Sequence, residues 1–204
     1  MQVAVLPFHA QNRPYKVMAE STTFVSRIST PLEGTQAPAW NATAPIPSPL
    51  ELHSPTVLPQ WVDYNSHMSE SCYLLVFGDN TDAFFRFIGI DESYRDDENR
   101  SFYTVETHIH NIREVAVGQP LRLTLQLLDA DEKRLHLFHA MYHGANGDLL
   151  ATGEQMLVHV DMKGGRAVTM SEHLALRVKA IVLAHAGLPK PKQAGSSIGI
   201  RRNT

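Results

Sequence analysis

A polar cluster runs directly into a long apolar segment between Trp61 and Asp82, where the chain reads WVDYNSHMSESCYLLVFGDNTD. The cluster carries a carboxylate at Asp63 and an imidazole at His67. The apolar segment is predicted to be a helix, and a helix N-terminus presents unpaired backbone N–H groups and the positive end of the helix dipole. An oxygen that gains negative charge in a reaction can be held there while a carboxylate acts beside it. This junction is the predicted active site.

Four polar side chains of the junction could serve chemistry or only structure. Asp63 is the first candidate for a catalytic group, although an Asp at such a position commonly caps a turn or a helix. Asn65 and His67 are further catalytic candidates, and the alternative is that both only hydrogen-bond the backbone. Glu70 falls in the first turn of the helix, where its charge suits the dipole, and a second carboxylate near Asp63 could raise the pKa of one of the two.

The predicted oxyanion donors are the backbone amides around Met68, Ser69 and Glu70. This role does not depend on side-chain identity, so it leaves little signal in a sequence. Asp79 and Asn80 lie in the middle of the predicted helix. We expect them to face a subunit interface and rank them as a secondary site.

The helix that supports the junction is predicted to begin near Ser69 and to end before Gly89, its C-terminal cap. Its apolar residues extend well beyond one stripe, so we expect a sheet wrapped around it. Pro55 places a predicted strand over 50–58 near a sheet edge. Further strands are predicted over 102–112, 121–128, 134–142 and 149–160, followed by a helix over 170–186. The connector over 91–100 is polar and charged. The four later strands are separated by turn compositions at Gly118–Pro120, Asp129–Asp131 and Gly144–Gly147, and such short connections imply an antiparallel meander. The predicted fold class is therefore α+β, with a long central helix wrapped by an antiparallel sheet of about five strands.

The chain has 204 residues, of which 43% are hydrophobic, and this suits one domain with tails. Residues 1–48 are rich in Pro, Ser and Thr and are predicted to be a flexible lead-in. Residues 49–165 are the predicted domain, and residues 166–204 are the predicted C-terminal helix and basic tail.

Charge and cysteine content limit the partners. A net charge of −3 gives no electrostatic reason to expect binding to nucleic acid or to an anionic membrane surface. No apolar run approaches the length of a transmembrane helix. The single cysteine, Cys72, cannot form an internal disulfide, which favours a reducing compartment, and the cytoplasm is expected.

Eleven histidines raise the question of a metal site. His108 with His110, and His139 with His143, could each share one face of a strand. No Cys or HExxH pattern accompanies them, so metal binding is not expected. The chain also has no G-x-S-x-G, G-x-G-x-x-G or P-loop motif, which leaves serine hydrolases, dinucleotide binding and nucleotide triphosphate binding without their usual residues.

The order of these features resembles the hotdog-fold thioesterases of the 4-hydroxybenzoyl-CoA thioesterase type. The residues that carry the resemblance are the D-x-N-x-H-M turn from Asp63 to Met68, the aromatic residues Tyr73 and Phe77 on the helix, and the four later strands. It covers roughly residues 50–165. The chain is also similar to the thioesterases associated with carnitine dehydrogenase, which are betainyl-CoA thioesterases. The segments that carry this similarity are REVAVGQPL, KRLHLFHAMYH, ATGEQMLVHVD and the ending AHAGLPKP…IGIRR.

The resemblance implies roles for the residues of the turn. Asp63 would be the catalytic carboxylate, which either activates water as a general base or attacks the thioester carbonyl to give a mixed anhydride. Asn65 and His67 would shape the loop and orient the carboxylate or the thioester. The chain departs from the family pattern at Ser66, where Gly is usual, and at Ser69, where Asn is usual. Without that Gly, the side chain of Ser66 could keep the loop backbone from approaching a substrate closely.

The resemblance also implies a small polar acyl-CoA thioester as substrate, with betainyl-CoA favoured, and no cofactor. The alternatives are another acyl specificity or a non-catalytic module that binds acyl-CoA. Aromatic faces suit a trimethylammonium group, so some nearby aromatic residues should line the site. These are Trp61, Tyr64, Tyr73, Phe77 and Phe102.

Two further expectations concern the CoA moiety and the assembly. Basic residues could contact the CoA phosphates, although most should be solvated surface charges. The candidates are Arg113, Arg122, Lys133, Arg134, Lys190, Lys192, Arg201 and Arg202. The family joins two sheets edge to edge with ligand sites across the interface, so a homodimer or homotetramer is expected.

Overall fold

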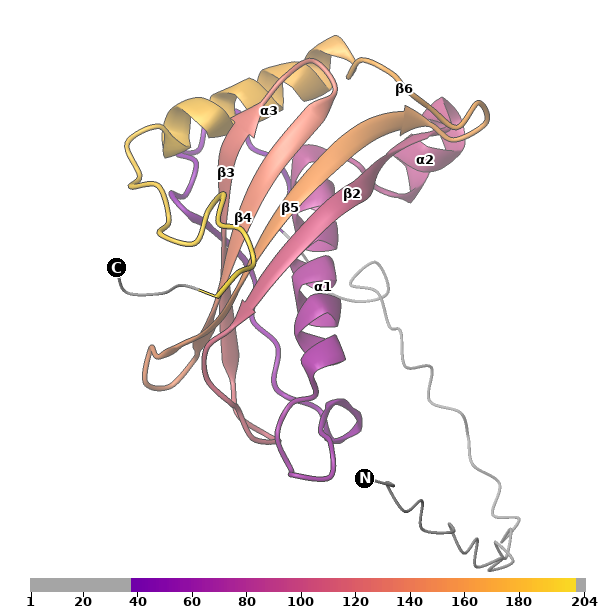
Figure 1. Cartoon of the computed structure of the whole chain (residues 1–204). Helices are drawn as coiled ribbons and strands as arrows, with labels where there is room; N and C mark the ends of the chain where they lie inside the picture. Colours follow the sequence, from indigo (N-terminus) through magenta and orange to yellow (C-terminus); the bar gives the residue numbers. More distant parts are fainter. Residues whose placement is uncertain (1–37, 201–204) are drawn as a thin grey trace, which may run out of the picture.

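The computed structural model describes residues 38–200 of the chain (Figure 1). The lead-in up to residue 37, and Arg201 and Arg202 at the other end, lie outside the described residues. The elements in chain order are β1 (Leu50–His53), η2 (Pro59–Trp61), α1 (Glu70–Ile88), α2 (Glu92–Glu98), β2 (Arg100–Asn111), β3 (Leu121–Ala130), β4 (Arg134–His143), β5 (Leu149–Asp161), β6 (Arg166–Ala167) and α3 (Glu172–His185).

The strands form one curled antiparallel sheet in the order β1-β3-β4-β5-β2, with β6 paired to β5. The long helix α1 lies along one face of this sheet (Figure 1). The predicted α+β hotdog arrangement is confirmed. Among the residues that the structure describes, no helix is long and apolar enough to cross a bilayer.

Helix α1 begins and ends as predicted. Ser69 is its N-cap, and Gly89 ends it in a left-handed conformation, with φ 92° and an N–H that donates to the carbonyl of Arg86. Phe77 is fully buried against β5, and Gly153 on that strand has no side chain to obstruct it. A Cβ at Gly153 would lie 2.9 Å from the Phe77 ring, so only glycine permits this close approach of helix and sheet.

The predicted meander is wrong at one connection. Strands β3, β4 and β5 are consecutive neighbours, but β2 lies at the far edge and pairs with β5. The segment 112–120, in which Gly118–Pro120 is predicted as a hairpin turn, therefore crosses three strand spacings, roughly 14 Å. It is held along the way, because Val115 is buried and the amides of Val57 and Met68 donate to its carbonyls.

Two smaller elements also differ from the prediction. Strand β1 ends at His53, before Pro55, which cannot donate to a sheet ladder. The predicted polar connector before β2 contains helix α2, whose first turn is capped by Asp91 accepting from the N–H of Tyr94 at 2.9 Å. Tyr94 is buried and its hydroxyl bonds His159 at 2.8 Å, so one aromatic residue anchors an otherwise charged helix.

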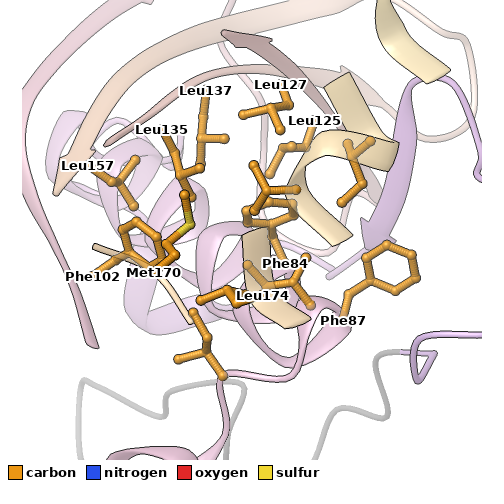
Figure 2. Close-up of a cluster of buried hydrophobic side chains, with 14 of the residues drawn as sticks. Phe84, Phe87, Phe102, Leu125, Leu127, Leu135, Leu137, Leu157, Met170 and Leu174 are labelled. Carbon is orange, nitrogen blue, oxygen red and sulfur yellow. The ribbon is translucent and has the colours of Figure 1, made fainter. Parts of the chain in front are cut away.

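The larger hydrophobic cluster joins the sheet, α1 and α3 (Figure 2). Phe84 and Leu137 meet Leu174 of the C-terminal helix in this cluster. Residues of α3 therefore share the core with the sheet and α1. Burial of such side chains stabilises the fold by about 1.5–3 kcal/mol each.

The last residues of the predicted lead-in contact the domain. The Trp40 ring lies 5.5 Å from the Phe87 ring, measured between centroids, and the Arg177 guanidinium lies 5.8 Å from the centre of the Trp40 ring. The carbonyl of Pro47 accepts from His185 at 3.2 Å. The stretch 40–48 thus packs on α1 and α3.

Candidate active site

The junction before α1 folds into a closed turn. The amide of Asp63 donates to the carbonyl of His67 at 3.0 Å, and the amide of Ser66 donates back to the carbonyl of Asp63 at 3.0 Å. Ser66 has a φ of 63°, a left-handed conformation that favours glycine. The loop thus keeps the backbone shape that the usual family Gly would supply, although Ser stands there.

The Asp63 carboxylate is half-buried, and one of its oxygens shapes the turn. Its Oδ1 accepts from the backbone N–H of Asn65 at 2.8 Å. The Oδ2 makes no hydrogen bond among the described residues, so it can accept a proton or attack a carbonyl carbon. The Asn65 side chain is exposed and takes no part in this contact, which comes from its backbone.

The turn docks on the segment 112–120. The amide of Met68 donates to the carbonyl of Val115 at 2.9 Å, and His67 pairs with Ala116 across an isolated bridge. The His67 Nδ1 lies 3.4 Å from a carboxylate oxygen of Glu114, an ion pair when the imidazole is protonated. Glu114 is the polar neighbour that the sequence prediction missed, since the segment is interpreted there only as a connection with a turn.

Hydrogen bonds within the protein already occupy two of the three backbone amides predicted as oxyanion donors. The amide of Met68 is engaged with Val115, and that of Ser69 donates to the carbonyl of Trp61 at 2.8 Å. The amide of Cys72 donates to the carbonyl of Ser69 at 2.9 Å. Among the residues that the structure describes, the amides of Glu70 and Ser71 at the start of α1 have no partner. These two N–H groups are the ones that remain for an oxyanion.

The aromatic residues near the turn divide into buried and exposed ones. Trp61 and Phe77 are buried in the smaller hydrophobic cluster, as is Tyr73, whose hydroxyl donates to the carbonyl of Arg113 at 3.2 Å. Tyr64 is 94% exposed on the turn itself. Phe102 belongs to the other cluster, near the start of β2, so it does not lie with the turn. Of the predicted set, Tyr64 is the one that presents its ring to solvent beside Asp63.

Asp79 and Asn80, the predicted secondary site in the middle of α1, lie in two different environments. The Asn80 amide lies 3.0 Å from the His139 Nδ1, whose Nε2 lies 3.1 Å from the Gln155 Oε1, and all three side chains are buried. Asp79 is buried too, and burial together with the nearby Asp82 raises its pKa to about 7. Neither residue belongs to the turn.

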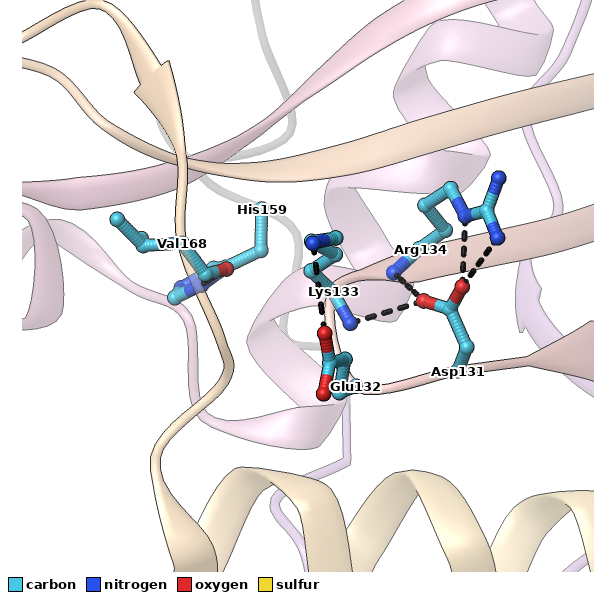
Figure 3. A network of polar contacts seen from close by, with 6 residues as sticks. All are labelled: Asp131, Glu132, Lys133, Arg134, His159 and Val168. Carbon is cyan, nitrogen blue, oxygen red and sulfur yellow. Dashed lines mark hydrogen bonds and ion pairs between the residues drawn. The ribbon is translucent and has the colours of Figure 1, made fainter.

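Four of the six candidate cations that the structure describes already have an acidic partner. Arg113 pairs with Asp148, Arg122 with Glu51, and Lys133 with Glu132. Figure 3 shows the Asp131 carboxylate, which accepts from the Arg134 side chain and from the amides of Lys133 and Arg134. Within residues 38–200, no group of three or more His, Cys, Asp or Glu side chains could hold a metal ion.

Residues 57–178 match the family model described as the thioesterase-like superfamily. The chain belongs to this superfamily. It is 42% identical over 151 residues to a betainyl-CoA thioesterase of Pseudomonas aeruginosa, which covers 74% of this chain and 95% of that protein. It is 47% identical over 154 residues to an L-carnitine dehydrogenase/betainyl-CoA thioesterase of a Rhizobium species, covering 76% of this chain. The match spans only 31% of that relative's length.

A solved structure from another organism has the same fold. A hypothetical protein of Staphylococcus aureus, determined in complex with CoA, superposes with a TM-score of 0.71 at 25% identity over 78% of this chain and 100% of that one. The superfamily and its fold agree with the resemblance on which Asp63 is ranked as the catalytic residue. The assignment of Asp63 itself stays a prediction.

Proposed function

We propose that the protein hydrolyses betainyl-CoA to glycine betaine and CoA. The observation that carries the proposal is the free Oδ2 of Asp63, on a turn that leads into the two unpartnered amides at the start of α1. A catalytic carboxylate beside backbone donors is what hydrolysis of a thioester requires. The acyl group is taken from the name of the P. aeruginosa relative, which this chain covers almost completely.

Two routes use the same geometry. As a general base, Asp63 takes a proton from water while the water oxygen bonds to the thioester carbon. The carbonyl oxygen becomes an oxyanion at the amides of Glu70 and Ser71, and the C–S bond then breaks with CoA leaving as a thiol that takes up the proton. As a nucleophile, the Asp63 Oδ2 instead bonds to the thioester carbon, and the C–S bond breaks to release CoA thiolate, which takes a proton from water. Water then cleaves the mixed anhydride to glycine betaine and the free Asp63 carboxylate. A single turnover in ¹⁸O-water detects the anhydride route when water attacks the Asp63 carbon of the anhydride, because only then does ¹⁸O enter the Asp63 carboxylate.

We propose that two chains pair through β2. This strand lies at a sheet edge, and its side chains Tyr103 and Val105 are 50% and 60% exposed. A long edge strand with exposed apolar residues is a template for pairing with another strand. Antiparallel pairing of two β2 strands would bring a second chain toward the turn, since 112–120 continues from β2 and contacts His67. The partner would then cover Tyr64.

The pairing is tested by light scattering on a variant that carries a charged residue on the edge strand β2. Val105→Lys should shift the protein toward monomer and reduce hydrolysis, because a buried Lys opposes strand pairing. Leu183→Lys is the control, since Leu183 is 67% exposed on α3, away from the edge. A wild type that is monomeric and fully active would contradict the dimer.

The acyl specificity is tested with two esters of matched shape. Betainyl-CoA is compared with the ester in which a tert-butyl group replaces trimethylammonium, by following release of the free thiol. The wild type should favour the charged ester in kcat/KM, because an aromatic face attracts a cation by about 0.5–2 kcal/mol. Tyr64→Leu should erode this preference and Tyr64→Phe should keep it. Equal hydrolysis of the neutral ester would leave only a general thioesterase.

A further inference from the structure

The face of the sheet opposite α1 has a furrow of small side chains. Residues on β3 and β4 alternate between faces, with the leucines of β3 and β4 toward α1 and the residues between them outward. Thr124, Ala140 and Thr152 are aligned across three strands by the register of the ladders. The larger Phe138 and Tyr142 flank Ala140 along β4, so the row is lower than its surroundings.

The chain after α3 covers this furrow (Figure 1, yellow). Residues 188–193 read LPKPKQ, and the two prolines limit the backbone freedom of the segment. It is fixed beyond this point, because the amide of Gly195 donates to both oxygens of Glu154 at 2.8 and 3.0 Å. The same carboxylate lies 2.6 Å from the His136 Nε2. Between the segment and the sheet lies a cavity of about 410 Å³, within the size range of small-molecule sites.

The cavity combines apolar walls with a buried hydroxyl that has no partner. Phe138, Leu149 and Leu188 supply apolar surface. Thr152, 2% exposed, lines the cavity, and its Oγ1 makes no hydrogen bond among the described residues. A buried hydroxyl without a partner has lost its hydrogen bonds to water, and a ligand that accepts its hydrogen would replace one of them.

The charged residues that line the cavity all carry a positive charge. Lys190 and Lys192 line it, and neither forms an ion pair within residues 38–200. No Asp or Glu is among the lining residues. A ligand with an apolar body and one negative charge therefore fits, whereas a cation would meet two lysines without a carboxylate.

We propose that this cavity binds a small amphipathic monocarboxylate, with its hydrocarbon chain in the furrow and its carboxylate toward Thr152 and the two lysines. The site is separate from the turn at Asp63, because the cavity and α1 are on opposite faces of the sheet. The proposal stands whether or not the enzyme acts on betainyl-CoA.

Octanoate is the probe, titrated into the full chain by isothermal titration calorimetry. Octanoate should bind with one site per chain, and 1-octanol and octylammonium should bind at least tenfold more weakly. Lys190→Glu combined with Lys192→Glu should weaken octanoate binding by roughly tenfold or more, since each reversal replaces attraction with repulsion. Lys163→Glu combined with Lys179→Glu is the matched control, with the same change in net charge away from the cavity, and should bind within twofold of the wild type.

Substitutions at Thr152 separate a binding role from a packing role. Thr152→Val should weaken octanoate binding about fivefold, yet raise the melting temperature of the ligand-free protein by removing an unpaired hydroxyl. Thr152→Ser should keep the binding. The proposal is overturned if octanoate does not bind, if both lysine pairs affect it equally, or if CoA displaces it.

Discussion

The two oxygens of Asp63 have different tasks at the scale of the single residue. Oδ1 is committed to the turn through the N–H of Asn65, while Oδ2 has no partner among the described residues. A carboxylate held by one oxygen is fixed in direction without losing its basic or nucleophilic atom. Asp63 can therefore both cap the turn and act in catalysis, because the hydrogen bond of Oδ1 to the turn fixes the direction of Oδ2.

Ser66 carries the strain of the turn. Its φ of 63° costs a residue with a Cβ about 1–2 kcal/mol. Ser66→Gly should therefore raise the free energy of unfolding by about 0.5 kcal/mol, after the greater freedom of glycine in the unfolded chain is counted. Ser66→Val should lower it by about 1–2 kcal/mol, because a β-branched residue disfavours this conformation. Urea unfolding measures both, and a stabilised Val variant would show that the loop is not held in this shape.

The sequence predicted the residues of the turn better than the groups around it. Asp63 and His67 stand in a recognisable spacing, so they could be found without a structure. The Glu114 contact depends on where 112–120 crosses the sheet, which no local pattern reveals. The sequence also does not show that the amides of Met68 and Ser69 are unavailable to an oxyanion, because they donate to the carbonyls of Val115 and Trp61, which lie in other segments.

At the scale of elements, local signals were sufficient for α1 and insufficient for the order of strands. Gly89 marks the end of α1 by its own conformation, and the alternation in β3, β4 and β5 marks those strands. The path of 112–120 is instead decided by long-range contacts to Val57 and Met68. A turn composition such as Gly118–Pro120 is the same in a hairpin and in a crossing, so the meander was the wrong choice between them.

The segment 40–48 should contribute to stability although its composition suggests a loose lead-in. A chain that begins at residue 38 keeps Trp40 on Phe87 and the carbonyl of Pro47 on His185, whereas one that begins at residue 49 loses both. The shorter chain should unfold with about 2–3 kcal/mol less free energy, from lost apolar burial and a hydrogen bond. Trp40→Ala in the longer chain should account for most of the loss. Equal melting temperatures for the two truncated chains would contradict this packing.

At the scale of the whole molecule, buried titratable groups tie stability to pH. Burial lowers the pKa of His139 to about 4, and burial together with Arg86 lowers that of His53 to about 4. Burial also lowers the pKa values of His159 and His185. As the pH falls from about 6.5 to about 4, these histidines become protonated in the unfolded chain but stay neutral in the folded one. The free energy of unfolding therefore decreases over this range.

Asp79 acts with the opposite sign. Its pKa of about 7 in the fold means that it holds a proton between pH 4 and 7 that the unfolded chain releases, which favours the fold as the pH falls. Asp79→Asn should therefore stabilise the protein at pH 8 by about 1–2 kcal/mol and steepen its loss of stability between pH 7 and 4. Urea unfolding at several pH values checks both, and an unchanged pH slope would contradict the buried, protonated Asp79.

Substitution of Asp63 tests the central claim for the molecule most directly. Asp63→Asn keeps the size and the acceptor oxygen of the side chain but removes the base or nucleophile. Its kcat for betainyl-CoA, measured by thiol release, should fall by roughly 10²–10⁴-fold or more. Calorimetry should show the ester still binding within a few-fold of the Kd of the wild type. Turnover near the wild-type value in this variant would contradict the assignment of the active site to the turn before α1.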